Sequence, residues 1–313
     1  MLKYFKRLLQ QGILGINNRN ANYTLKYNIR SKYPIVDNKL KTKQLAIEAG
    51  IPVPDLYSVI EIERQIQDIH DIVSCYPDFV IKPACGSGGD GVLVIAGHTR
   101  NMYKKASGVL MREDELKYHI SYILSGLYSL GGQSDNAIIE YRVESDPVFE
   151  PISFFGVPDI RIIVLFGVPV MSMIRLPTRM SDGKANLHQG AIGAGIDIAT
   201  GITLSAVCKN EIIIEHPDTG NSVTGIEIPY WKKLLTIASQ CYDLTGLAYQ
   251  GVDIVLDKEK GPMILELNAR PGLNIQIANQ SGLLPRLKAV EQHYRELNSV
   301  EDKIHFAVDH FGQ

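Results

Sequence analysis

The sequence contains little cysteine, and its cysteines form no recognisable pattern. The four residues Cys75, Cys85, Cys208 and Cys241 are scattered, with no C-x-x-C pair among them. This spacing excludes a disulfide framework and a zinc site built from cysteine pairs. It is typical of a chain that folds in a reducing compartment, and we therefore predict a cytoplasmic location.

The sequence also lacks an excess of either charge and a long hydrophobic run. The formal net charge is −2, and basic and acidic residues are mixed along all 313 residues. No broad basic surface is predicted, so nucleic acid is not expected as a partner. Pro158, Asp159 and Arg161 interrupt the most apolar region, which leaves it short of the roughly 18 residues that a membrane-spanning helix needs.

The first fifteen residues carry basic side chains but no secretory signal. They lead into Asn-rich sequence in place of a continuous apolar stretch with a small-residue cleavage site. Leu2, Phe5, Leu8 and Leu9 recur at helical spacing. This pattern predicts a helix that either lies on a membrane surface or docks on the body of the protein, and docking is the more common use of such a helix.

What the chain does contain is enough apolar sequence for a sizeable core. An apolar content of 45 % over 313 residues is ordinary for a globular protein of two or three lobes. Residues 16–36 are rich in Asn, Tyr and basic side chains, which predicts an irregular stretch laid over another surface. Residues 1–36 together are predicted to form a helical or irregular N-terminal arm. Residues 37–137 and 138–313 are predicted to form an N-terminal and a C-terminal lobe of mixed helices and strands.

Periodicity and turn residues predict the elements of both lobes. Helix 38–49 has the clearest ends, with Asp37 as candidate N-cap and Gly50 as the stop before Pro52 and Pro54. Further helices are expected near 60–74, 228–243 and 283–297, with a mixed helical stretch near 100–130. Strands are expected at 79–82, 91–96, 137–143, 159–166 and 168–176, followed by a long irregular loop at 177–225.

The most informative motif is the hairpin GVDIVLDKEKGPMILELNARPG, residues 251–272. Asp253 lies in its first strand, and Glu266 and Asn268 lie two steps apart in its second. Side chains two steps apart point from the same face of a strand, toward whatever Asp253 faces. Three oxygen ligands without His or Cys favour Mg²⁺ or Mn²⁺ over Zn²⁺. A plain hairpin with one solvated face is the alternative.

A second motif, FVIKPACGSGGDGVLVI, places Lys82 at a strand end before a glycine-rich loop. Glycines let the backbone approach phosphate oxygens, and the lysine adds a positive charge. The loop lacks a G-K-[ST] ending and runs into a strand, so it is neither a Walker A loop nor a Rossmann turn. The candidate phosphate-binding residues of the loop are Gly86, Ser87, Gly88, Gly89 and Gly91.

Arginines stand beside these anionic motifs. Arg161 and Arg175 belong to neighbouring predicted strands, and Arg270 follows the metal-type hairpin directly. Arginine binds carboxylates and phosphates through two parallel hydrogen bonds, so these residues are candidates for clamping an anionic substrate. An ion pair within the protein, for example between Arg161 and Glu144, is the alternative for any one of them.

Together these motifs resemble the ATP-grasp superfamily, from about Asp37 to Leu284. Within it, the segments DIRIIVLFGVPVMSMIR, NLHQGA and ELNARPGL look like RimK-type alpha-L-glutamate ligases. The chain resembles most closely the family named alpha-L-glutamate ligase-like and is also similar to sugar-transfer-associated ATP-grasp proteins. Lys39 and Lys82 resemble the two nucleotide-binding lysines of the superfamily, and the Gly86–Gly91 loop resembles the flap over the phosphates. The adenine hinge is resembled by Glu140, Tyr141 and Val143. The metal ligands are resembled by Asp253, Glu266 and Asn268.

This resemblance implies an α+β fold in which two lobes with mainly antiparallel sheets grip ATP. It implies an ATP-dependent ligase with Mg²⁺ or Mn²⁺, in which a carboxylate attacks the γ-phosphorus and an amine then displaces phosphate from the acyl phosphate. Arg270 is then expected at the transferring phosphoryl group, and Arg161 or Arg175 at the carboxylate. His188 is the only candidate base for the amine, although a loop histidine is more often simply solvated.

The expected substrates are a small carboxylate, such as glutamate or another amino acid, and an amine on a small molecule, peptide, protein or glycan precursor. RimK-type enzymes carry an α/β domain of about a hundred residues before the first lysine, whereas this sequence has only 36 residues there. The arm or a second subunit of a homo-oligomer must then close that side. A kinase acting on a hydroxyl, a nucleotide-binding regulatory module and a ligase of envelope precursors remain alternatives.

Overall fold

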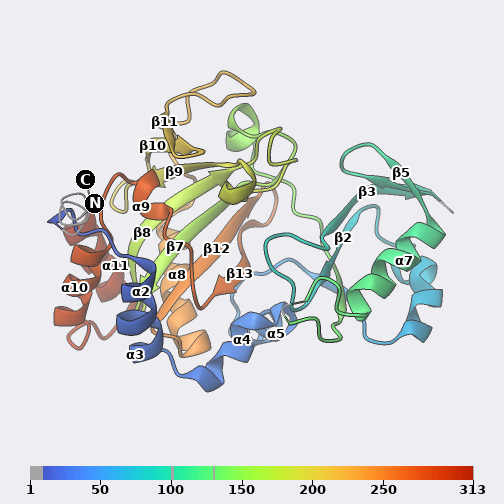
Figure 1. The fold of residues 1–313 in the computed structure, drawn as a ribbon, viewed down its shortest axis with the longest axis horizontal. Helices are drawn as coiled ribbons and strands as arrows, with labels where there is room; N and C mark the ends of the chain where they lie inside the picture. Colours follow the sequence, from blue (N-terminus) through green and yellow to red (C-terminus); the bar gives the residue numbers. More distant parts are fainter. Residues whose placement is uncertain (1–9, 100–101, 130, 313) are drawn as a thin grey trace.

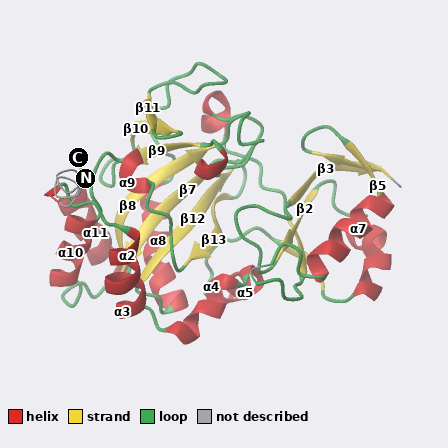
Figure 2. Ribbon diagram, in the orientation of Figure 1, coloured by secondary structure: helices red, strands yellow, loops and turns green. Residues whose placement is uncertain are grey.

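The computed structural model describes residues 10–99, 102–129 and 131–312, which form two lobes of unequal size (Figure 1). Each lobe is built on an antiparallel sheet, and helices cover the sheets (Figure 2). The predicted α+β class is confirmed. The helix predicted from Leu2, Phe5, Leu8 and Leu9 lies outside the described residues. No helix in these ranges is both long enough and apolar enough to cross a membrane.

The smaller lobe holds a six-stranded sheet in the order β1-β6-β2-β3-β4-β5. Its own core includes Phe79 and Ile81 of the sheet and Leu116, Ile120 and Ile123 of a helix. The strands are β1 (Leu56–Ile60), β2 (Phe79–Pro83), β3 (Leu93–Thr99), β4 (Met102–Lys105), β5 (Leu110–Arg112) and β6 (Ala137–Glu140), and the helices are η3 (Glu63–Asp68), α6 (Ile69–Val73) and α7 (Glu113–Leu124).

The larger lobe holds a seven-stranded sheet in the order β11-β10-β9-β8-β7-β12-β13. Its strands are β7 (Asp159–Leu165), β8 (Val168–Leu176), β9 (Ile192–Ile196), β10 (Thr203–Cys208), β11 (Glu211–Ile213), β12 (Tyr249–Asp257) and β13 (Gly261–Asn268). Its helical segments are η4 (Pro147–Ile152), η5 (Leu187–Gln189), α8 (Trp231–Thr245), α9 (Ile275–Ala278), α10 (Leu284–His293) and α11 (Val300–Phe311).

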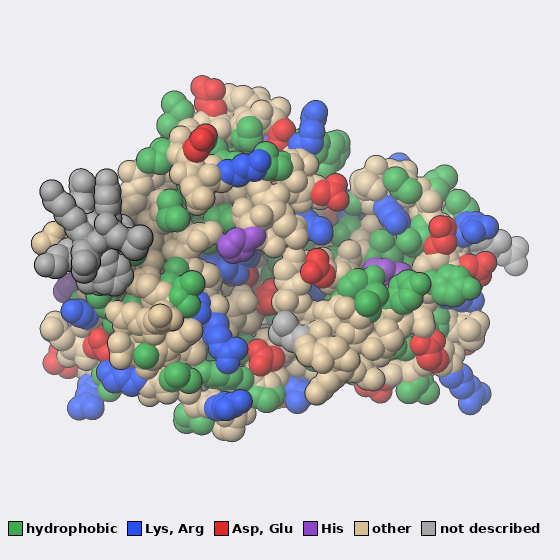
Figure 3. Space-filling view, in the orientation of Figure 1, with side chains coloured by type: hydrophobic (Ala, Val, Ile, Leu, Met, Phe, Trp, Pro, Cys, Tyr) green, Lys and Arg blue, Asp and Glu red, His purple; other side chains and the backbone are tan. Residues whose placement is uncertain are grey.

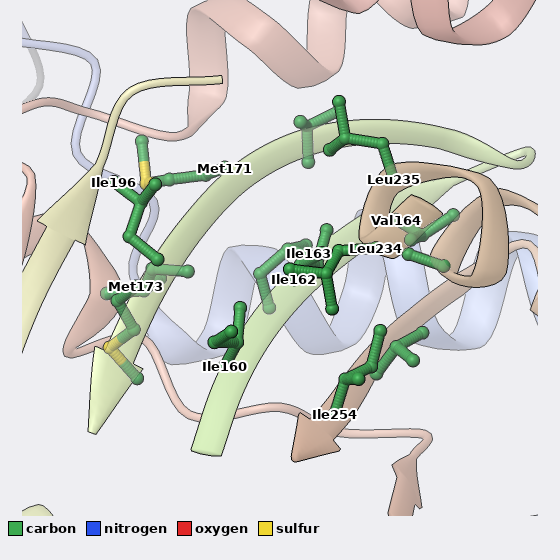
Figure 4. Packing of buried hydrophobic residues seen from close by; sticks show 14 of the residues in the cluster. Ile160, Ile162, Ile163, Val164, Met171, Met173, Ile196, Leu234, Leu235 and Ile254 are labelled. Atoms are coloured by element: carbon green, nitrogen blue, oxygen red, sulfur yellow. The ribbon is translucent and has the colours of Figure 1, made fainter. Parts of the chain in front are cut away.

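One face of the larger sheet forms the main hydrophobic core. Ile160 and Ile162 of β7 and Ile254 of β12 share this core with Leu234 and Leu235 of α8 (Figure 4). Side chains alternate across a strand, so burial of Ile160 and Ile162 on this face turns Asp159 and Arg161 to the opposite one. The charged residues of β7 are thereby presented on the side of the sheet opposite α8.

The N-terminal segment is more regular than its composition predicts. Residues 16–36, expected to be largely irregular, form α2 (Ile16–Arg19), a π-helical turn η1 (Asn20–Thr24), α3 (Leu25–Tyr27), η2 (Arg30–Lys32) and α4 (Tyr33–Asp37). Tyr23, Tyr33 and Val36 are buried in the core of the larger lobe. Tertiary contacts therefore stabilise short helices that the local sequence does not encode strongly. These residues of the arm thus pack on the larger lobe, and the division of the chain into arm and lobes stays a prediction.

Helix α5 (Lys39–Glu48) appears where it was predicted, with one correction at its start. Asn38, and not Asp37, is the N-cap: its side-chain oxygen accepts hydrogen bonds from the backbone N–H groups of Leu40 and Lys41 at 3.0 and 3.1 Å. Ala46 of this helix is buried in the core of the larger lobe. A lobe boundary at residue 37 stays an interpretation, because α5 packs with the larger lobe.

Three other predicted segments differ from the structure. The helix expected near 60–74 is split into η3 and α6 and follows a strand, β1, that was not predicted. The stretch near 100–130 contains strands β4 and β5 before α7, and the loop expected at 177–225 contains β9, β10 and β11. Strand β1 pairs with β6, which is distant in sequence, whereas β4, β5 and β11 each pair with the strand immediately before them. Pairing within the sheet, and not local propensity, decides whether such short strands form.

Candidate active site

The register of the larger sheet places the predicted charged residues side by side on the face opposite α8. Arg161 of β7 lies opposite Asp253 of β12, and Asp253 lies opposite Glu266 of β13. Arg175 of β8 lies opposite Asp159, which is two steps from Arg161 and hence on the same face. The structure therefore brings together residues from four strands that the sequence analysis had grouped only by motif.

An irregularity in β13 makes this arrangement possible. Asp253 pairs with Glu266, but the next residue, Ile254, pairs with Ile264, so Leu265 is an extra residue between the two pairs. Such a bulge shifts the alternation of side chains by one position. As a result Ile264 joins the core while Glu266 and Asn268 face the same side as Asp253.

Asp253 is buried and fully engaged with two arginines. Arg161 donates hydrogen bonds from Nε and Nη2 to the two carboxylate oxygens at 2.7 and 2.6 Å, and Arg175 donates a third from Nη2 at 2.8 Å. Arg175 also donates two hydrogen bonds to Asp159 at 2.5 and 2.7 Å. The alternative pairing of Arg161 with Glu144 is wrong, because Glu144 pairs with Arg142 and Lys258 instead.

The two buried carboxyl groups of this network have opposite pKa shifts. Burial opposes ionisation of Asp253, but Arg161 and Arg175 together hold its pKa below the ordinary value. Burial raises the pKa of Asp159 to about 6, since Arg175 only partly offsets it and the nearby Asp253 carboxylate raises it further. Asp253 is thus the firmly charged member, and it anchors both guanidinium groups.

The three predicted metal ligands differ in how far their side chains are already bonded to other residues. Glu266 has an ion-pair contact with Lys39 at 3.7 Å, and Asn268 donates a hydrogen bond from Nδ2 to Asp253 at 3.2 Å, which leaves its oxygen as an acceptor. Oxygen donors from Glu266 and Asn268 fit a hard divalent cation completed by water and phosphate. Asp253 fits as a third ligand only if it exchanges an arginine contact. Among the described residues, no group of three or more His, Cys, Asp and Glu forms a metal cluster.

The smaller lobe contributes a buried cluster of two lysines around one carboxylate. Glu140 of β6 forms ion pairs with Lys82 of β2 and with Lys43 of α5, the latter at 3.0 Å. Lys43 also donates a hydrogen bond to the carbonyl of Pro54. Burial alone would raise the pKa of Glu140, but Lys82 and Lys43 outweigh it and lower the pKa. Burial lowers the pKa of Lys43.

Lys39 connects the two lobes at the base of the predicted flap. Its backbone N–H donates a hydrogen bond to the carbonyl of Ala84 at 2.8 Å, and its ammonium group donates one to the carbonyl of Gly86. The same ammonium group lies 3.7 Å from Glu266 of the larger lobe. One cavity between the lobes is lined by Lys39, Lys43, Lys82 and Glu266. Figure 3 shows basic, acidic and histidine side chains gathered in the hollow between the lobes.

The glycine-rich loop follows β2 and precedes β3, as predicted. Gly91 has a φ of +74°, and a Cβ there would lie 2.6 Å from the ring of Tyr128, so only glycine fits this position. The carbonyl of Gly88 accepts a hydrogen bond from Asn186 at 3.4 Å. The loop from the smaller lobe therefore touches the 177–190 segment of the larger lobe. Ser87 and Gly89 line a second pocket on this loop.

The predicted adenine hinge continues from β6. Glu140 is buried within the sheet, and the N–H of Tyr141 donates a hydrogen bond to the carbonyl of Asp55 at 2.9 Å. Tyr141 donates its hydroxyl to Asp257 at 3.0 Å. Among the described residues the N–H of Val143 has no hydrogen-bond partner, which leaves it as the amide able to meet an adenine edge.

Two predicted catalytic residues lie on loops. Arg270 is exposed, and its guanidinium group lies over the ring of Tyr33 at 5.1 Å from the ring centre. His188 is exposed in η5, where its backbone N–H donates to the side chain of Asn186 at 3.0 Å. The structure brings neither side chain into the Arg161–Asp253 network, and their catalytic roles stay predictions.

Sequence reasoning missed three residues that shape this site. Lys43 stands four residues after Lys39, and that spacing on one helix face was a usable signal. Asp159 faces Arg175 across a predicted hairpin, so its pairing was also within reach once the register was known. Arg19 of the arm donates to the carbonyl of Pro271 at 2.7 Å, and no local pattern signals a contact over 252 residues.

The chain was also compared with known proteins. The family model of the sugar-transfer associated ATP-grasp proteins matches residues 18–292. No curated protein matches the chain. Among solved structures, the ATP-grasp ligase PsnB complexed with minimal precursor is similar at 17 % identity and a TM-score of 0.45, covering 85 % of this chain and 63 % of PsnB. This chain thus spans less than two thirds of that relative.

Two further solved structures are similar at the same level. The D-alanine–D-alanine ligase from Bacillus anthracis has 16 % identity and a TM-score of 0.46, covering 90 % of this chain and 70 % of the ligase. The D-cycloserine synthetase DcsG has 15 % identity and a TM-score of 0.46, covering 83 % and 71 %. The RimK-type resemblance stays a prediction. Because the family model covers most of its length, the chain belongs to the sugar-transfer-associated ATP-grasp family and has the ATP-grasp fold.

Proposed function

We propose that this protein is an ATP-dependent, ADP-forming carboxylate–amine ligase that makes an amide bond through an acyl phosphate. One observation carries the proposal: a single cavity between the lobes is lined both by lysines suited to phosphate, Lys39 and Lys82, and by Glu266, suited to a divalent cation. Triphosphate with its metal ion needs both kinds of group within a few ångströms.

The smaller lobe supplies the binding groups for the nucleotide. Lys82 is held by Glu140, so its ammonium group is oriented before a phosphate arrives. The Gly86–Gly91 loop, which Lys39 contacts at Gly86, would offer backbone N–H groups to the phosphates, and Val143 its N–H to the adenine. Lys39 exchanges its contact with Gly86 or Glu266 for a phosphate oxygen in this proposal. These roles require no side-chain nucleophile.

The larger lobe supplies the groups that neutralise charge where one anion attacks another. Arg161 and Arg175 hold fixed positions because Asp253 and Asp159 bind their forks. Their remaining N–H groups are suited to a substrate carboxylate or to the acyl phosphate. A bound Mg²⁺ or Mn²⁺ would draw charge from the β- and γ-phosphate oxygens, and Glu266 and Asn268 would hold it. Arg270 completes the set at the transferring phosphoryl group.

The reaction then has two steps. The carboxylate oxygen attacks the γ-phosphorus as the bond to the ADP oxygen breaks, and the amine nitrogen next attacks the acyl carbon as phosphate leaves with its bonding electrons. The amine must lose a proton in the second step, and His188 is the candidate to accept it. The family's association with sugar transfer supports a glycan or glycan-precursor acceptor over a free amino acid.

The proposal is tested by measuring ADP release from purified protein with MgATP, amino acids or other small carboxylates, and amine acceptors that include amino sugars. Hydroxylamine replaces the amine in a parallel series and traps any acyl phosphate as a hydroxamate. We expect ADP release that requires a carboxylate, with hydroxamate formed in equal amount. ADP release with a stable phosphorylated hydroxyl product would instead establish a kinase.

The same experiment distinguishes a ligase from a nucleotide-binding regulatory module. Such a module binds MgATP but releases no ADP with any carboxylate or acceptor. Arg161→Met provides a matched variant, because it removes the guanidinium group from the proposed carboxylate site while Glu140, Lys82 and the flap are unchanged. Loss of carboxylate-dependent ADP release with retained ATP binding supports the assignment of this face to the carboxylate.

A further inference from the structure

We propose that the helical arm, residues 16–37, positions Arg270 in the active site through two residues, Tyr33 and Arg19. The inference rests on the proposed function and extends it to residues that touch no substrate. The arm lies on the larger lobe (Figure 1), where Tyr23, Tyr33 and Val36 are buried in its core.

The first contact holds the Arg270 side chain. Its guanidinium group lies 5.1 Å from the centre of the Tyr33 ring, and Tyr33 is itself buried in the core at the start of α4. An aromatic face attracts a cation, and arginine stacks on it readily. Val36 of the same helix lines the cavity with Glu266, so α4 contributes both to this contact and to the cavity.

The second contact holds the backbone of the loop that carries Arg270. Arg19 is buried, and its Nη1 donates to the carbonyl of Pro271 at 2.7 Å and to that of Arg270 at 3.4 Å. Its Nε and Nη2 both donate to Asn20 at 3.0 and 2.8 Å. The guanidinium fork is therefore oriented from one side by Asn20 and fixes the loop from the other.

The loop is also seated directly on catalytic elements. A Cβ added to Gly251 would lie 2.7 Å from Pro271, so the glycine allows this close approach. Gly251 is two residues before Asp253 on β12, and Gly272 faces a nitrogen of Arg161. A shift of the loop would move Arg270 relative to the whole Arg161–Asp253 network.

Other contacts anchor the arm away from Arg270. Asn28 pairs with the backbone of Tyr249, donating to its carbonyl at 2.7 Å and accepting from its N–H at 2.9 Å. Lys26 pairs with Glu291 of α10 at 3.2 Å and is half exposed. Lys26→Met is therefore a matched control that weakens the attachment of the arm to the lobe without touching the Arg270 loop.

The experiment measures the affinities for MgADP and for Mg²⁺ with AMPPNP, whose third phosphate is the one that Arg270 would contact. The variants are Tyr33→Leu, Tyr33→Phe, Arg19→Met, Arg19→Lys, Arg270→Met, the double variant Tyr33→Leu with Arg270→Met, and Lys26→Met. Tyr33→Phe keeps the ring and loses only the hydroxyl. Arg19→Lys keeps the charge and loses the fork.

We expect Tyr33→Leu to weaken AMPPNP binding about fivefold with ADP binding unchanged, the size of one solvent-exposed cation–ring contact. Arg270→Met should have the same effect, and the double variant should add nothing further. Arg19→Met should act in the same direction with Arg19→Lys failing to restore it, while Tyr33→Phe and Lys26→Met bind both nucleotides as the unmutated protein does. With active protein, kcat should fall more than KM for ATP changes.

Two results would overturn the inference. Equal weakening of ADP and AMPPNP binding by Tyr33→Leu would show a general structural effect, and additive losses in the double variant would show that Tyr33 and Arg270 act independently. If Tyr33→Leu does not fold, Arg19→Lys supplies the same comparison. Failure of the unmutated protein to bind either nucleotide would overturn the proposed function itself, which separates that failure from loss of the coupling alone.

Discussion

The two lobes use buried ion pairs in opposite ways. At the smaller lobe two lysines, Lys82 of β2 and Lys43 of the neighbouring helix α5, surround one carboxylate, Glu140. In the larger lobe three carboxylates, Asp159, Asp253 and Glu266, stand on one sheet face with two arginines. The first cluster has an excess of positive charge and suits phosphate, whereas the second has an excess of negative charge and suits a metal ion.

The clusters also differ in their exposure. The side chains of Lys82 and Glu140 are 7 % and 3 % exposed, whereas those of Arg161 and Arg175 are 12 % and 14 % exposed and Glu266 is 28 % exposed. The smaller-lobe cluster is therefore mainly structural support for Lys82. The larger-lobe cluster keeps one side open, as a site that must exchange protein contacts for substrate contacts requires.

The largest effect should be a loss of activity on changing Glu266, the most exposed member of the larger-lobe cluster. Glu266→Gln keeps the size of the side chain but removes its charge, and we expect ADP release to fall by at least about 100-fold, because even the residues that support metal ligands cost up to this much. Thermal unfolding should be unchanged, since Glu266 is not in the core. Glu211→Gln, on exposed β11, is the control. Normal turnover with an unchanged Mg²⁺ requirement would refute the metal assignment.

The second-largest effect should be a loss of stability when the smaller-lobe cluster is changed. Lys43→Met keeps the length of the side chain but leaves Glu140 with Lys82 alone, and we expect the free energy of unfolding to fall by about 3 kcal/mol, as when one partner of a buried pair is removed. Urea unfolding measures it. Lys41→Met on the exposed face of α5 is the control. Equal stability of the two variants would show that Lys43 is not part of the support.

The larger-lobe cluster, unlike the smaller-lobe cluster, should make the free energy of unfolding depend on pH through Asp159. The pKa of Asp159 is raised to about 6 from an ordinary value of 3.8, so the folded state binds its proton more tightly than the unfolded state does. The resulting stability is present below about pH 4 and is lost as the pH rises through 6. Relative to Asp159→Asn, the unmutated protein should lose about 2 to 3 kcal/mol between pH 4 and 7, measured by urea unfolding. A constant difference across this range would contradict the shift.

The smallest effect should come from an ion pair outside both clusters. Arg142 donates a hydrogen bond to Asp78 at 3.0 Å, and both side chains are partly exposed. Partly exposed pairs contribute little because solvent screens them, so Arg142→Met should change the free energy of unfolding by less than about 1 kcal/mol. A loss as large as that of Lys43→Met would erase the distinction between buried and exposed pairs on which the comparison rests.

The sequence was sufficient where the chemistry is local. The hairpin at 251–268 shows acid, acid and amide at alternating positions, and the glycine-rich loop after Lys82 shows its own turn chemistry, so both could be located without the structure. Helix α5 and strands β7 and β8 carry strong periodic or apolar signals and appear where predicted. Strands β1, β4, β5, β9, β10 and β11 were not predicted, because such short strands form through pairing with a partner strand, whether distant, as β6 is for β1, or adjacent, as β3 is for β4.

By itself, then, the sequence determined the ATP-grasp superfamily and the fold class, and it singled out charged residues as site candidates, because those depend on residue type and spacing. Only the tertiary structure decided which charges meet. The bulge at Leu265 aligns Glu266 with Asp253, the sheet register joins Arg175 to Asp159, and the arm brings Arg19 to Pro271. These pairings form between segments up to 252 residues apart, where packing and hydrogen-bond satisfaction, and not local preference, select the partner.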